Sequence, residues 1–400
     1  MAVFVSHPQA LQQVFSSDTR QFCAPSNQLM KPIVGDYSML VLEGDRHRRM
    51  RKLLLPPLHG ERMRNYGELI CTLADALFSR MVSGERFVAR AAMQTLSLEV
   101  ILRAVFGIGE GERLQQLKHL IPDLLDMFQS PLATGALYFP GLRKDWGPWS
   151  PWGRFCQLRQ QIDRLIYEEI RDRKANYDPD RADILNLLID ARDEAGESMT
   201  DEELRDELMT LLFAGHETTA TALSWAMYWI HRTPEVRQKL LAELDDLGQD
   251  PDPTQLAKLP YLNAVCSETL RLYPVALATA PRAVKEPVEL LGYQLEPGTG
   301  LYGCIYFTHR REDLYPEPEQ FRPERFLERQ FSPYEFFPFG GGVRRCIGEA
   351  LALFEIKLVL ATVLSRYNLA LADRRPERPR RRAVTLAPGK GVRMVFLGRR

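Results

Sequence analysis

The sequence has no run of about 18 apolar residues, the length that a membrane-spanning helix needs. It carries no excess charge of either sign, because 52 Lys and Arg balance 52 Asp and Glu, so its overall charge does not indicate a nucleic-acid partner. It has no internal repeat and no C-x-x-C pair. Its six cysteines lie far apart, which excludes a disulfide scaffold and favours reduced thiols in a cytoplasmic compartment.

What the chain does have is amphipathic spacing typical of helices. The pattern predicts helices over 7–15, 62–82, 92–106, 112–128, 152–176, 183–195, 200–233, 234–248 and 259–273. Strand signals are few and short, over 1–5, 288–291, 293–295, 300–302, 384–386 and 392–396, and the last two are interpreted as a C-terminal hairpin. No linker divides the chain. We therefore expect one domain over 1–400, mainly α with small β-sheets.

One cysteine has distinctive surroundings, in Phe339-Gly340-Gly341-Gly342-Val343-Arg344-Arg345-Cys346-Ile347-Gly348. Nearby cations and a following helix N-terminus lower the pKa of a thiol and stabilise its anion. Glycines let the backbone approach a flat group and point N–H groups at the sulfur. These properties suit a thiolate held against a metal in a macrocycle, and the alternative is a buried structural cysteine after a glycine-rich turn.

This segment resembles the haem-binding loop of cytochromes P450, Phe-x-x-Gly-x-Arg-x-Cys-x-Gly, and matches it at every fixed position. The resemblance implies haem b as the cofactor and Cys346 as the axial ligand of its iron. It also places Phe339, Gly340, Arg344 and Gly348 among the haem-binding residues.

A second motif, Ala214-Gly215-His216-Glu217-Thr218-Thr219, lies inside the long helix expected over 200–233. Gly and Thr are poor choices for a helix interior, and a Thr hydroxyl that bonds back to the preceding turn loosens the helix locally. The motif resembles the P450 oxygen-activation sequence, which implies that Ala214 and Gly215 lie over the haem. Thr218 is then expected to hydrogen-bond dioxygen and Glu217 to help deliver protons. The alternative is an ordinary buried helix with one charged residue on its outer face.

Two further matches concern charge. Glu268 and Arg271 form an E-x-x-R pair, and Pro323-Glu324-Arg325-Phe326 resembles a later P450 element, so the resemblance implies a buried ion-pair triad of Glu268, Arg271 and Arg325 that places the haem loop. An exposed pair of little energetic value is the alternative for the first two.

Haem carries two propionates, which need cations. Arg51, Arg282 and Arg344 are the candidates by family position, with His47, one helical turn before Arg51, as a weaker one. The neighbouring basic residues of the same segment, together with the arginine before Cys346, suggest either an electropositive face for an acidic electron donor or ordinary solvated surface; they are Arg48, Arg49, Lys52 and Arg345.

The segment 131–152 is rich in Pro, Gly and aromatic residues and occupies the position of the P450 F–G loop. Peripheral contact with a membrane and packing against the protein body are both open interpretations. The basic segment 374–382 is interpreted as a solvated loop, because it lacks the aromatic interleaving of a nucleic-acid site. The stretches that correspond to P450 substrate contacts are apolar, at 22–42, 124–138, 211–213, 275–280 and 386–388, which indicates a lipophilic substrate.

The motifs follow one another in P450 order along the chain, and the sequence is identified as a member of that family that starts after the usual first helix and strand. The resemblance implies a monooxygenase that inserts one oxygen atom of O2 into a C–H bond of a fatty acid, alkane or terpenoid. Electrons, ultimately from NADPH, would come from a separate ferredoxin, flavodoxin or reductase. The alternatives are a P450-fold enzyme that uses or rearranges peroxide, and a non-catalytic haem-binding sensor.

Overall fold

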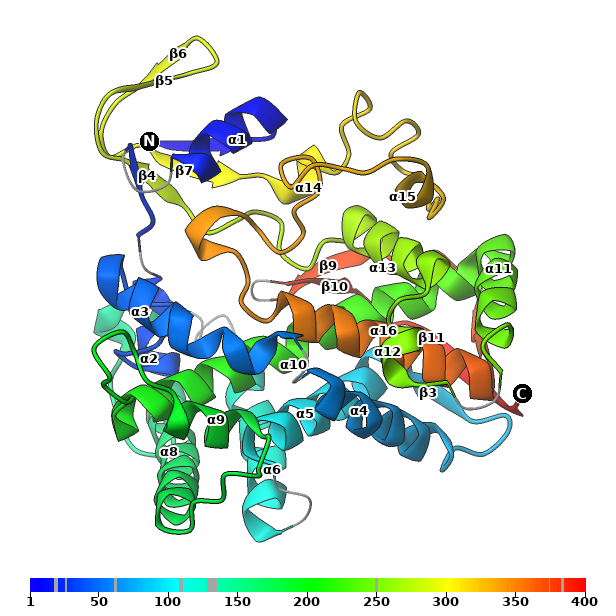
Figure 1. Cartoon of the computed structure of the whole chain (residues 1–400), viewed down its shortest axis with the longest axis horizontal. Helices are drawn as coiled ribbons and strands as arrows, with labels where there is room; N and C mark the ends of the chain where they lie inside the picture. The colour runs from blue at the N-terminus through cyan, green and yellow to red at the C-terminus, as the bar shows by residue number, and fades with distance from the viewer. Residues whose placement is uncertain are drawn as a thin grey trace. The chain divides into compact units, whose positions relative to one another are not determined.

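The computed structural model describes residues 1–17, 21–25, 27–60, 63–107, 111–127, 135–137, 139–248, 251–373, 375–382 and 385–400. Helices dominate and short strands accompany them, as the sequence predicts (Figure 1). The chain divides into two compact units: Met1–Pro25, Gly67–Leu96 and Thr218–Arg400 form unit 1, and Ser26–Tyr66 and Ser97–Glu217 form unit 2. The single domain expected over 1–400 stays a prediction.

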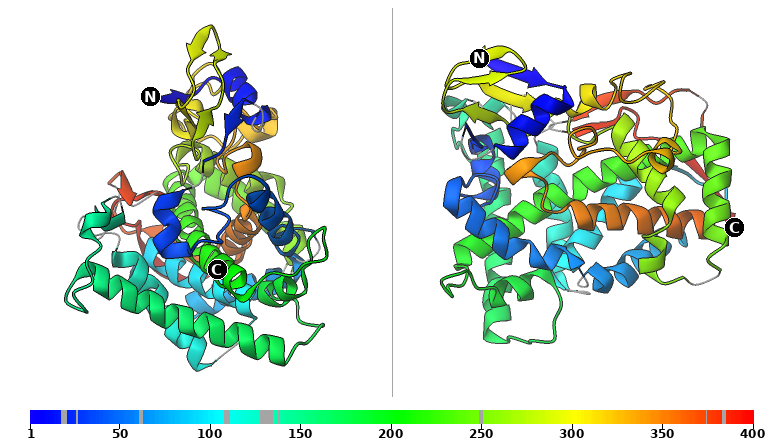
Figure 2. Two further views of the ribbon diagram at one scale, coloured as in Figure 1. Left: turned by 90° about the vertical axis from the view of Figure 1, so that its left-hand side faces the viewer. Right: turned by 45° about the horizontal axis from the view of Figure 1, so that its top comes forward.

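The N-terminal strand of unit 1 enters a four-stranded sheet of order β1-β7-β4-β2. β1 (Ala2–Val5) runs parallel to β7 (Gly300–Gly303), whereas β4 (Arg282–Val284) and β2 (Phe22–Cys23) pair in antiparallel fashion. Helix α1 (Pro8–Ser16) packs Leu11, Val14 and Phe15 on this sheet. The strands β5 (Val288–Leu290) and β6 (Tyr293–Leu295) form a separate hairpin, which projects beside α1 (Figure 2).

The C-terminal strands of unit 1 belong to two sheets. β11 (Arg393–Arg399) lies between β3 (Arg86–Val88) and β8 (Tyr367–Leu371), while β10 (Thr385–Pro388) pairs with β9 (Pro379–Arg382). The predicted hairpin of the last two strands is therefore wrong, because Glu377 accepts the backbone N–H groups of Lys390 and Val392 and turns the connecting segment away. The basic segment, expected as a loop, ends as strand β9; its Arg374, and residue 384 of the expected strand, lie outside the described residues.

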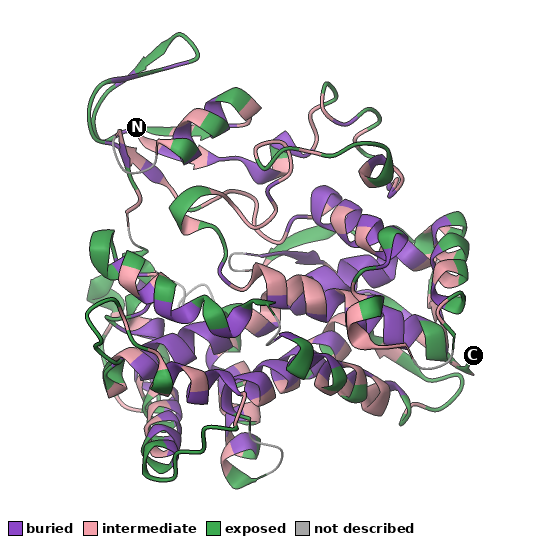
Figure 3. Cartoon of the chain, viewed as in Figure 1, coloured by how far each residue is buried: buried purple, intermediate pink, exposed green. Residues whose placement is uncertain are grey.

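The helical part of unit 1 is built around α13 (Pro260–Leu272) and α16 (Glu349–Arg366), both mostly buried (Figure 3). Around them pack α11 (Pro234–Asp245), α12 (Pro253–Leu256) and α15 (Arg325–Glu328), and α14 (Ile305–Thr308) follows β7. Apolar residues recur on α11 and α13 at the spacing that the sequence predicts, so burial of that face drives their packing.

Unit 2 contains several short helices and the two longer helices α6 (Glu112–Met127) and α8 (Pro151–Ala175), which pack on each other. Its elements are η1 (Gln28–Met30), α2 (Lys31–Val34), α3 (Gly44–Leu54), η2 (Pro56–Leu58), α6, η4 (Pro140–Leu142), α8 and α9 (Ile184–Asp190). Three helices each contain a boundary between the units: α4 (Met63–Phe78), α5 (Ala89–Phe106) and α10 (Asp201–Arg232). Helix α9 ends five residues before its predicted end, because Asp193 accepts the N–H groups of Ala195 and Glu197 and forms a turn.

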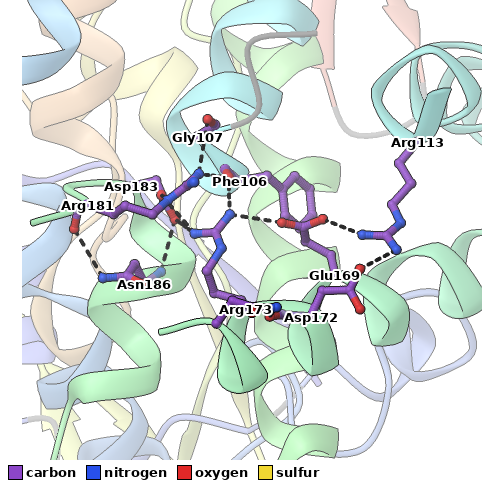
Figure 4. Close-up of polar contacts among 10 residues, drawn as sticks. Phe106, Gly107, Arg113, Glu169, Asp172, Arg173, Arg181, Asp183 and Asn186 are labelled. Carbon is purple, nitrogen blue, oxygen red and sulfur yellow. Dashed lines mark hydrogen bonds and ion pairs between the residues drawn. The ribbon is translucent and has the colours of Figure 1, made fainter. Parts of the chain in front are cut away.

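A buried ion cluster holds the end of α5 in unit 2 (Figure 4). Arg173, 5% exposed, donates to both carboxylate oxygens of Asp183 at 2.7 and 2.8 Å, to Glu169 at 2.9 Å and to the backbone carbonyl of Phe106 at 2.6 Å. Arg181 donates to Asp183 and to the same carbonyl. Two guanidinium groups therefore satisfy the free carbonyl end of α5, where cations are favoured. A surface cavity of about 410 Å³ adjoins the cluster.

Candidate functional site

The glycine-rich loop of unit 1 closes on itself immediately before α16. Its ends are joined by a hydrogen bond of 3.0 Å from the backbone N–H of Cys346 to the carbonyl of Phe339. Gly340 and Gly342 have φ angles of +74° and +64°, a left-handed conformation that favours glycine. The Cys346 side chain is exposed, and a Cβ added at Gly348 would meet no atom within 4 Å. The loop thus presents a thiol on an open surface.

Two arginines fasten this loop to other parts of unit 1. Arg282, 1% exposed, donates to the carbonyl of Gly341 at 2.9 Å, and Arg344 donates to the carbonyl of Ala24 at 3.0 Å. Gly341 also lies so close to the ring of Phe15 that an added Cβ would approach it to 2.4 Å. The loop therefore has its backbone fixed on both sides of the 3-10 turn η5 (Gly342–Arg344).

One guanidinium, paired with a carboxylate, and a helix N-terminus lie near the Cys346 thiol. Arg345 forms a two-pronged ion pair with Glu349 at 2.6 and 2.7 Å, and both the pair with Glu349 and the nearby Cys346 raise the pKa of this guanidinium. Helix α16 begins at Glu349, three residues after the cysteine, so its N-terminal dipole adds further positive potential. Such a helix end favours a nearby anion.

The predicted ion-pair triad is confirmed. Glu268 and Arg271 are 0% exposed and Arg325 is 4% exposed. Arg271 donates to both oxygens of Glu268, at 2.7 and 2.9 Å, and Arg325 donates to one of them at 3.1 Å. The backbone N–H of Arg322 adds a fourth hydrogen bond at 2.8 Å. All four members come from α13 and from the segment around α15.

The oxygen-activation motif lies on α10, across the boundary between the units. Glu203 and Thr200 form a capping box at its start. The helix then continues without a break from Asp201 to Arg232, and the local loosening expected around Thr218 stays a prediction. Ala214 is exposed in the middle of this otherwise largely buried helix. An added Cβ at Gly215 would lie 3.0 Å from Ile101, so this glycine permits close packing on α5 in unit 2.

Glu217, with Ala214 and Gly215, belongs to unit 2, while Thr218 is the first α10 residue of unit 1. His47 and Arg51 share a face of α3 in unit 2, where His47 is 6% exposed and Arg51 is half-buried.

The basic residues considered for an electropositive face, on α3 in unit 2 and before Cys346 in unit 1, each have an acidic partner, which favours the alternative of ordinary solvated surface. Arg49 pairs with Asp193 and Glu203, Lys52 with Glu194, Arg48 with Asp45, and Arg345 with Glu349.

Sequence reasoning missed two groups of polar contacts. In unit 2, the segment 37–39 is fastened to α10 by Asp206, Glu207 and Thr210, which contact the Tyr37 N–H, the Met39 N–H and the Ser38 hydroxyl. Burial raises the pKa of Glu207 well above its usual value. Asp206 and Glu207 are adjacent acids within a largely apolar helical segment, and this pattern could have indicated that they bind polar partners inside the protein. In unit 1, His309 hydrogen-bonds the chain just before the glycine-rich loop.

Comparison with known proteins decides the family. The sequence profile described as "Cytochrome P450" matches residues 1–394. The chain belongs to the cytochrome P450 family. Two proteins of Mycobacterium tuberculosis are similar to this P450. "Putative cytochrome P450 135B1" is 38% identical over 98% of this chain and 81% of the relative, and "Putative cytochrome P450 138" is 36% identical over 98% of this chain and 86% of the relative.

The P450 fold is confirmed by a solved structure, a retinoic-acid-bound cyanobacterial CYP120A1. It matches with a TM-score of 0.85 at 23% identity, over 99% of this chain and 88% of the other. The protein is therefore a haem-thiolate monooxygenase in its broad class, with haem b as cofactor. An exposed cysteine on a fixed, glycine-rich loop of unit 1 fits such a group. Within the described part of the chain, no helix is long and apolar enough to cross a membrane.

Proposed function

We propose that this P450 hydroxylates a lipophilic small molecule and that Cys346 is the axial ligand of its haem iron. When bound, haem b supplies reductive activation of O2 and insertion of one oxygen atom into a C–H bond. The overall reaction consumes the substrate, O2, two electrons and two protons, and it yields the hydroxylated product and water. The observation that carries the proposal is the exposed Cys346 thiol on its glycine-rich loop before α16.

The test is the absorption difference spectrum of the dithionite-reduced protein with and without carbon monoxide. We expect a long-wavelength Soret band in the wild type and its loss in Cys346→Ser. Cys23→Ser is the matched control, because Cys23 is also an exposed cysteine of unit 1. A folded, haem-loaded Cys346→Ser protein that keeps the band would contradict the ligand assignment.

The other haem-binding residues are proposed from the family motif together with the local contacts. Arg344 and Arg282 fix the loop backbone and, with Arg51 and His47 on α3, are the cations assigned to the propionates. Phe339, Gly340 and Gly348 are assigned to the face of the haem loop. Replacing Arg51 by Met is expected to weaken haem retention without changing the fold, as measured by haem transfer to apomyoglobin; unchanged retention would remove Arg51 from the set.

For proton delivery we propose the carboxyl of Glu217 and the hydroxyl of Thr218. A hydroxyl donor at Thr218 directs a proton to the reacting oxygen, and the half-buried carboxyl of Glu217 replenishes it. Thr218→Ala is expected to keep O2 consumption while shifting its product from alcohol to hydrogen peroxide. Thr219→Ala, at the adjacent buried position, serves as the control. Equal coupling in Thr218→Ala and wild type would refute the role.

The substrate class follows from the apolar stretches and from one neighbour. The cyanobacterial structure of the same fold holds retinoic acid, an isoprenoid acid, which supports a fatty acid, alkane or terpenoid here. The test is turnover with a ferredoxin, a flavodoxin or a P450 reductase as the electron donor and NADPH as the reductant, over a panel of these compounds. Product formed only with peroxide would instead identify a peroxide-using enzyme. If no compound of the panel gives a product or a change in the haem spin state, the protein would be a haem-binding sensor.

We also propose that η4 and the segment after it contact a membrane surface, the source of lipophilic substrate. Trp149 is 94% exposed, Trp146 73% and Phe139 66%, with the Lys144 ammonium 5.8 Å from the ring of Trp146. Exposed tryptophans beside a cation are typical of membrane interfaces. Residues 131–134 and 138 of the predicted loop lie outside the described part.

The dispersed cysteines favour a cytoplasmic location, so we expect the membrane contact to be peripheral. Co-sedimentation with lipid vesicles tests this contact. The double variant Trp146→Ala/Trp149→Ala is expected to lose binding to vesicles that contain anionic lipid. Tyr293→Ala, which removes a ring that is 75% exposed in the β5–β6 hairpin, is expected to bind normally. Equal binding by all three proteins would refute the contact.

A further inference from the structure

His309 is a fully buried residue at the end of α14 in unit 1. Its imidazole lies against aromatic rings, with centroid distances of 5.2 Å to Phe336, 5.4 Å to Phe337 and 6.3 Å to Tyr315. A histidine in such surroundings has either a packing role or a specific hydrogen-bonding role, and the contacts of its polar atoms distinguish the two.

The backbone carbonyl and one ring nitrogen of His309 are hydrogen-bonded, whereas the buried Nδ1 has no partner among the described residues. Its backbone carbonyl accepts from the Arg271 guanidinium at 2.7 Å, which connects it to the triad with Glu268 and Arg325. Its ring atom Nε2 accepts from the backbone N–H of Phe337 at 3.0 Å. An imidazole that accepts at Nε2 must be neutral, with its proton on Nδ1. Burial first, and then the positive charge of Arg271, lower the pKa of His309 to about 3, so this form persists at neutral pH.

Phe337 in turn lies two residues before the glycine-rich loop, which starts at Phe339. Its carbonyl accepts the N–H of Gly340 at 2.9 Å, and the carbonyl of Phe339 accepts the N–H of Cys346 at 3.0 Å. A continuous series of hydrogen bonds and short chain segments therefore leads from the buried triad through His309 and Phe337 to the cysteine. Without an acceptor at His309, the buried N–H of Phe337 loses this partner, and a buried donor without a partner is costly.

We propose that His309 is a positioning residue, whose Nε2 atom holds the Phe337 amide and thereby orients the Cys346 loop for thiolate ligation. The inference rests on the proposed function, since it assumes that Cys346 binds iron. In the hydrogen bonds described above, no side chain of the triad contacts the Cys346 loop directly. The inference explains how the triad can still affect this loop: Arg271 fixes the backbone of His309, and the His309 imidazole holds the Phe337 amide before the loop.

The experiment compares three variants with the wild type. His309→Phe keeps a ring for stacking and removes the acceptor, whereas His309→Gln restores an acceptor oxygen. Tyr315→Phe is the control, because it removes a hydroxyl that donates to the Glu335 carbonyl at 2.9 Å but keeps the ring beside His309. Two quantities are measured: the share of long-wavelength reduced carbon monoxide complex, and the hydrogen exchange of the Phe337 amide in the haem-free protein.

We expect His309→Phe to lose haem about tenfold faster and to show a large shorter-wavelength share, since residues that orient a metal ligand typically contribute 10- to 100-fold to metal affinity. His309→Gln and Tyr315→Phe should stay within about twofold of wild type, and the Phe337 amide should lose protection only in His309→Phe. The inference is overturned if His309→Phe keeps the wild-type band, if His309→Gln behaves like His309→Phe, or if Tyr315→Phe has the same effect.

The two measurements also separate this inference from the proposed function. A wild-type protein without the long-wavelength band would refute thiolate ligation at Cys346, and amide exchange at Phe337 would still decide whether His309 holds the loop. If His309→Phe does not fold, His309→Gln alone decides the hydrogen bond: a protected Phe337 amide supports it, and an unprotected one refutes it.

Discussion

Replacing Glu268 by Gln removes one negative charge from the centre of unit 1 and almost nothing else. The carboxylate accepts four hydrogen bonds, three from the guanidinium groups of Arg271 and Arg325 and one from a backbone N–H. Glutamine keeps the shape of the side chain. It replaces one accepting oxygen with an NH2 group that can only donate, and this group must face another donor whichever way the amide is turned.

The magnitude follows from burial. Glu268 and Arg271 are 0% exposed and Arg325 is 4% exposed, so the substitution leaves two buried guanidinium groups without their counter-charge. Removing one partner from a buried ion pair typically costs about 3–5 kcal/mol, and the lost hydrogen bonds are part of that figure. We expect the free energy of unfolding to fall by about 4 kcal/mol, the centre of that range.

The assay is urea unfolding followed by tryptophan fluorescence, with Glu328→Gln as the matched control. The Glu328 carboxylate lies 2.5 Å from the guanidinium of Arg322, a distance like those in the triad, but the two side chains are 54% and 40% exposed. Such an exposed pair contributes about 0–1 kcal/mol. If Glu268→Gln costs less than about 1 kcal/mol, or no more than the control, the triad is not the desolvated ion cluster that the structure shows.

Three further predictions concern stability in urea. Burial lowers the pKa of His231 to about 4, so the unfolded chain takes up a proton first as the pH falls below about 6.5. The contribution of His231 to the free energy of unfolding should drop by about 2 kcal/mol by pH 5, in addition to the loss that the buried His309 causes in the same way. His231→Gln should therefore lose about 2 kcal/mol less than the wild type, and an equal loss would refute this prediction. Gly341→Ala should lower the free energy of unfolding by about 1–3 kcal/mol, because the added methyl group clashes with the Phe15 ring, and adding Phe15→Leu should recover part of this loss. If the losses of the two single variants simply add in the double variant, the clash is contradicted. Arg173→Met should lower the free energy of unfolding by about 3–5 kcal/mol. Arg181→Met should lower it by only about 1 kcal/mol, because the Arg181 side chain is 35% exposed. Similar losses in the two variants would show that burial does not decide the difference.

Local patterns in the sequence predicted most of the fold. The spacing of apolar residues located the long helices, and Tyr293–Leu295 forms the strand that was expected. The motifs around Cys346 and Glu268 were identified because each is a short run of neighbouring residues whose charges and side-chain types indicate their chemistry directly. The family resemblance supplied the third member of the triad, Arg325, which lies 57 residues from Glu268.

Contacts between distant segments were not predictable in the same way. The sequence shows that α3 is basic, but not that Asp193, Glu194 and Glu203 lie opposite its charges. Nor does it show that His309 reaches the Phe337 amide. The C-terminal hairpin failed for the same reason, since strand pairing depends on partners elsewhere in the chain, and alternation within a strand does not identify them.

The parallel pairing of β1 with β7 has a consequence for synthesis on the ribosome. Residues 2–5 pair with residues 300–303, so the first strand emerges almost three hundred residues before its partner. At a translation rate of about 5–20 residues per second, this interval is roughly 15–60 s. Throughout it, the apolar strand that contains Val3, Phe4 and Val5 has no sheet to join. A nascent chain stalled before residue 300 should therefore expose this strand to chaperones, while a chain released after it should not.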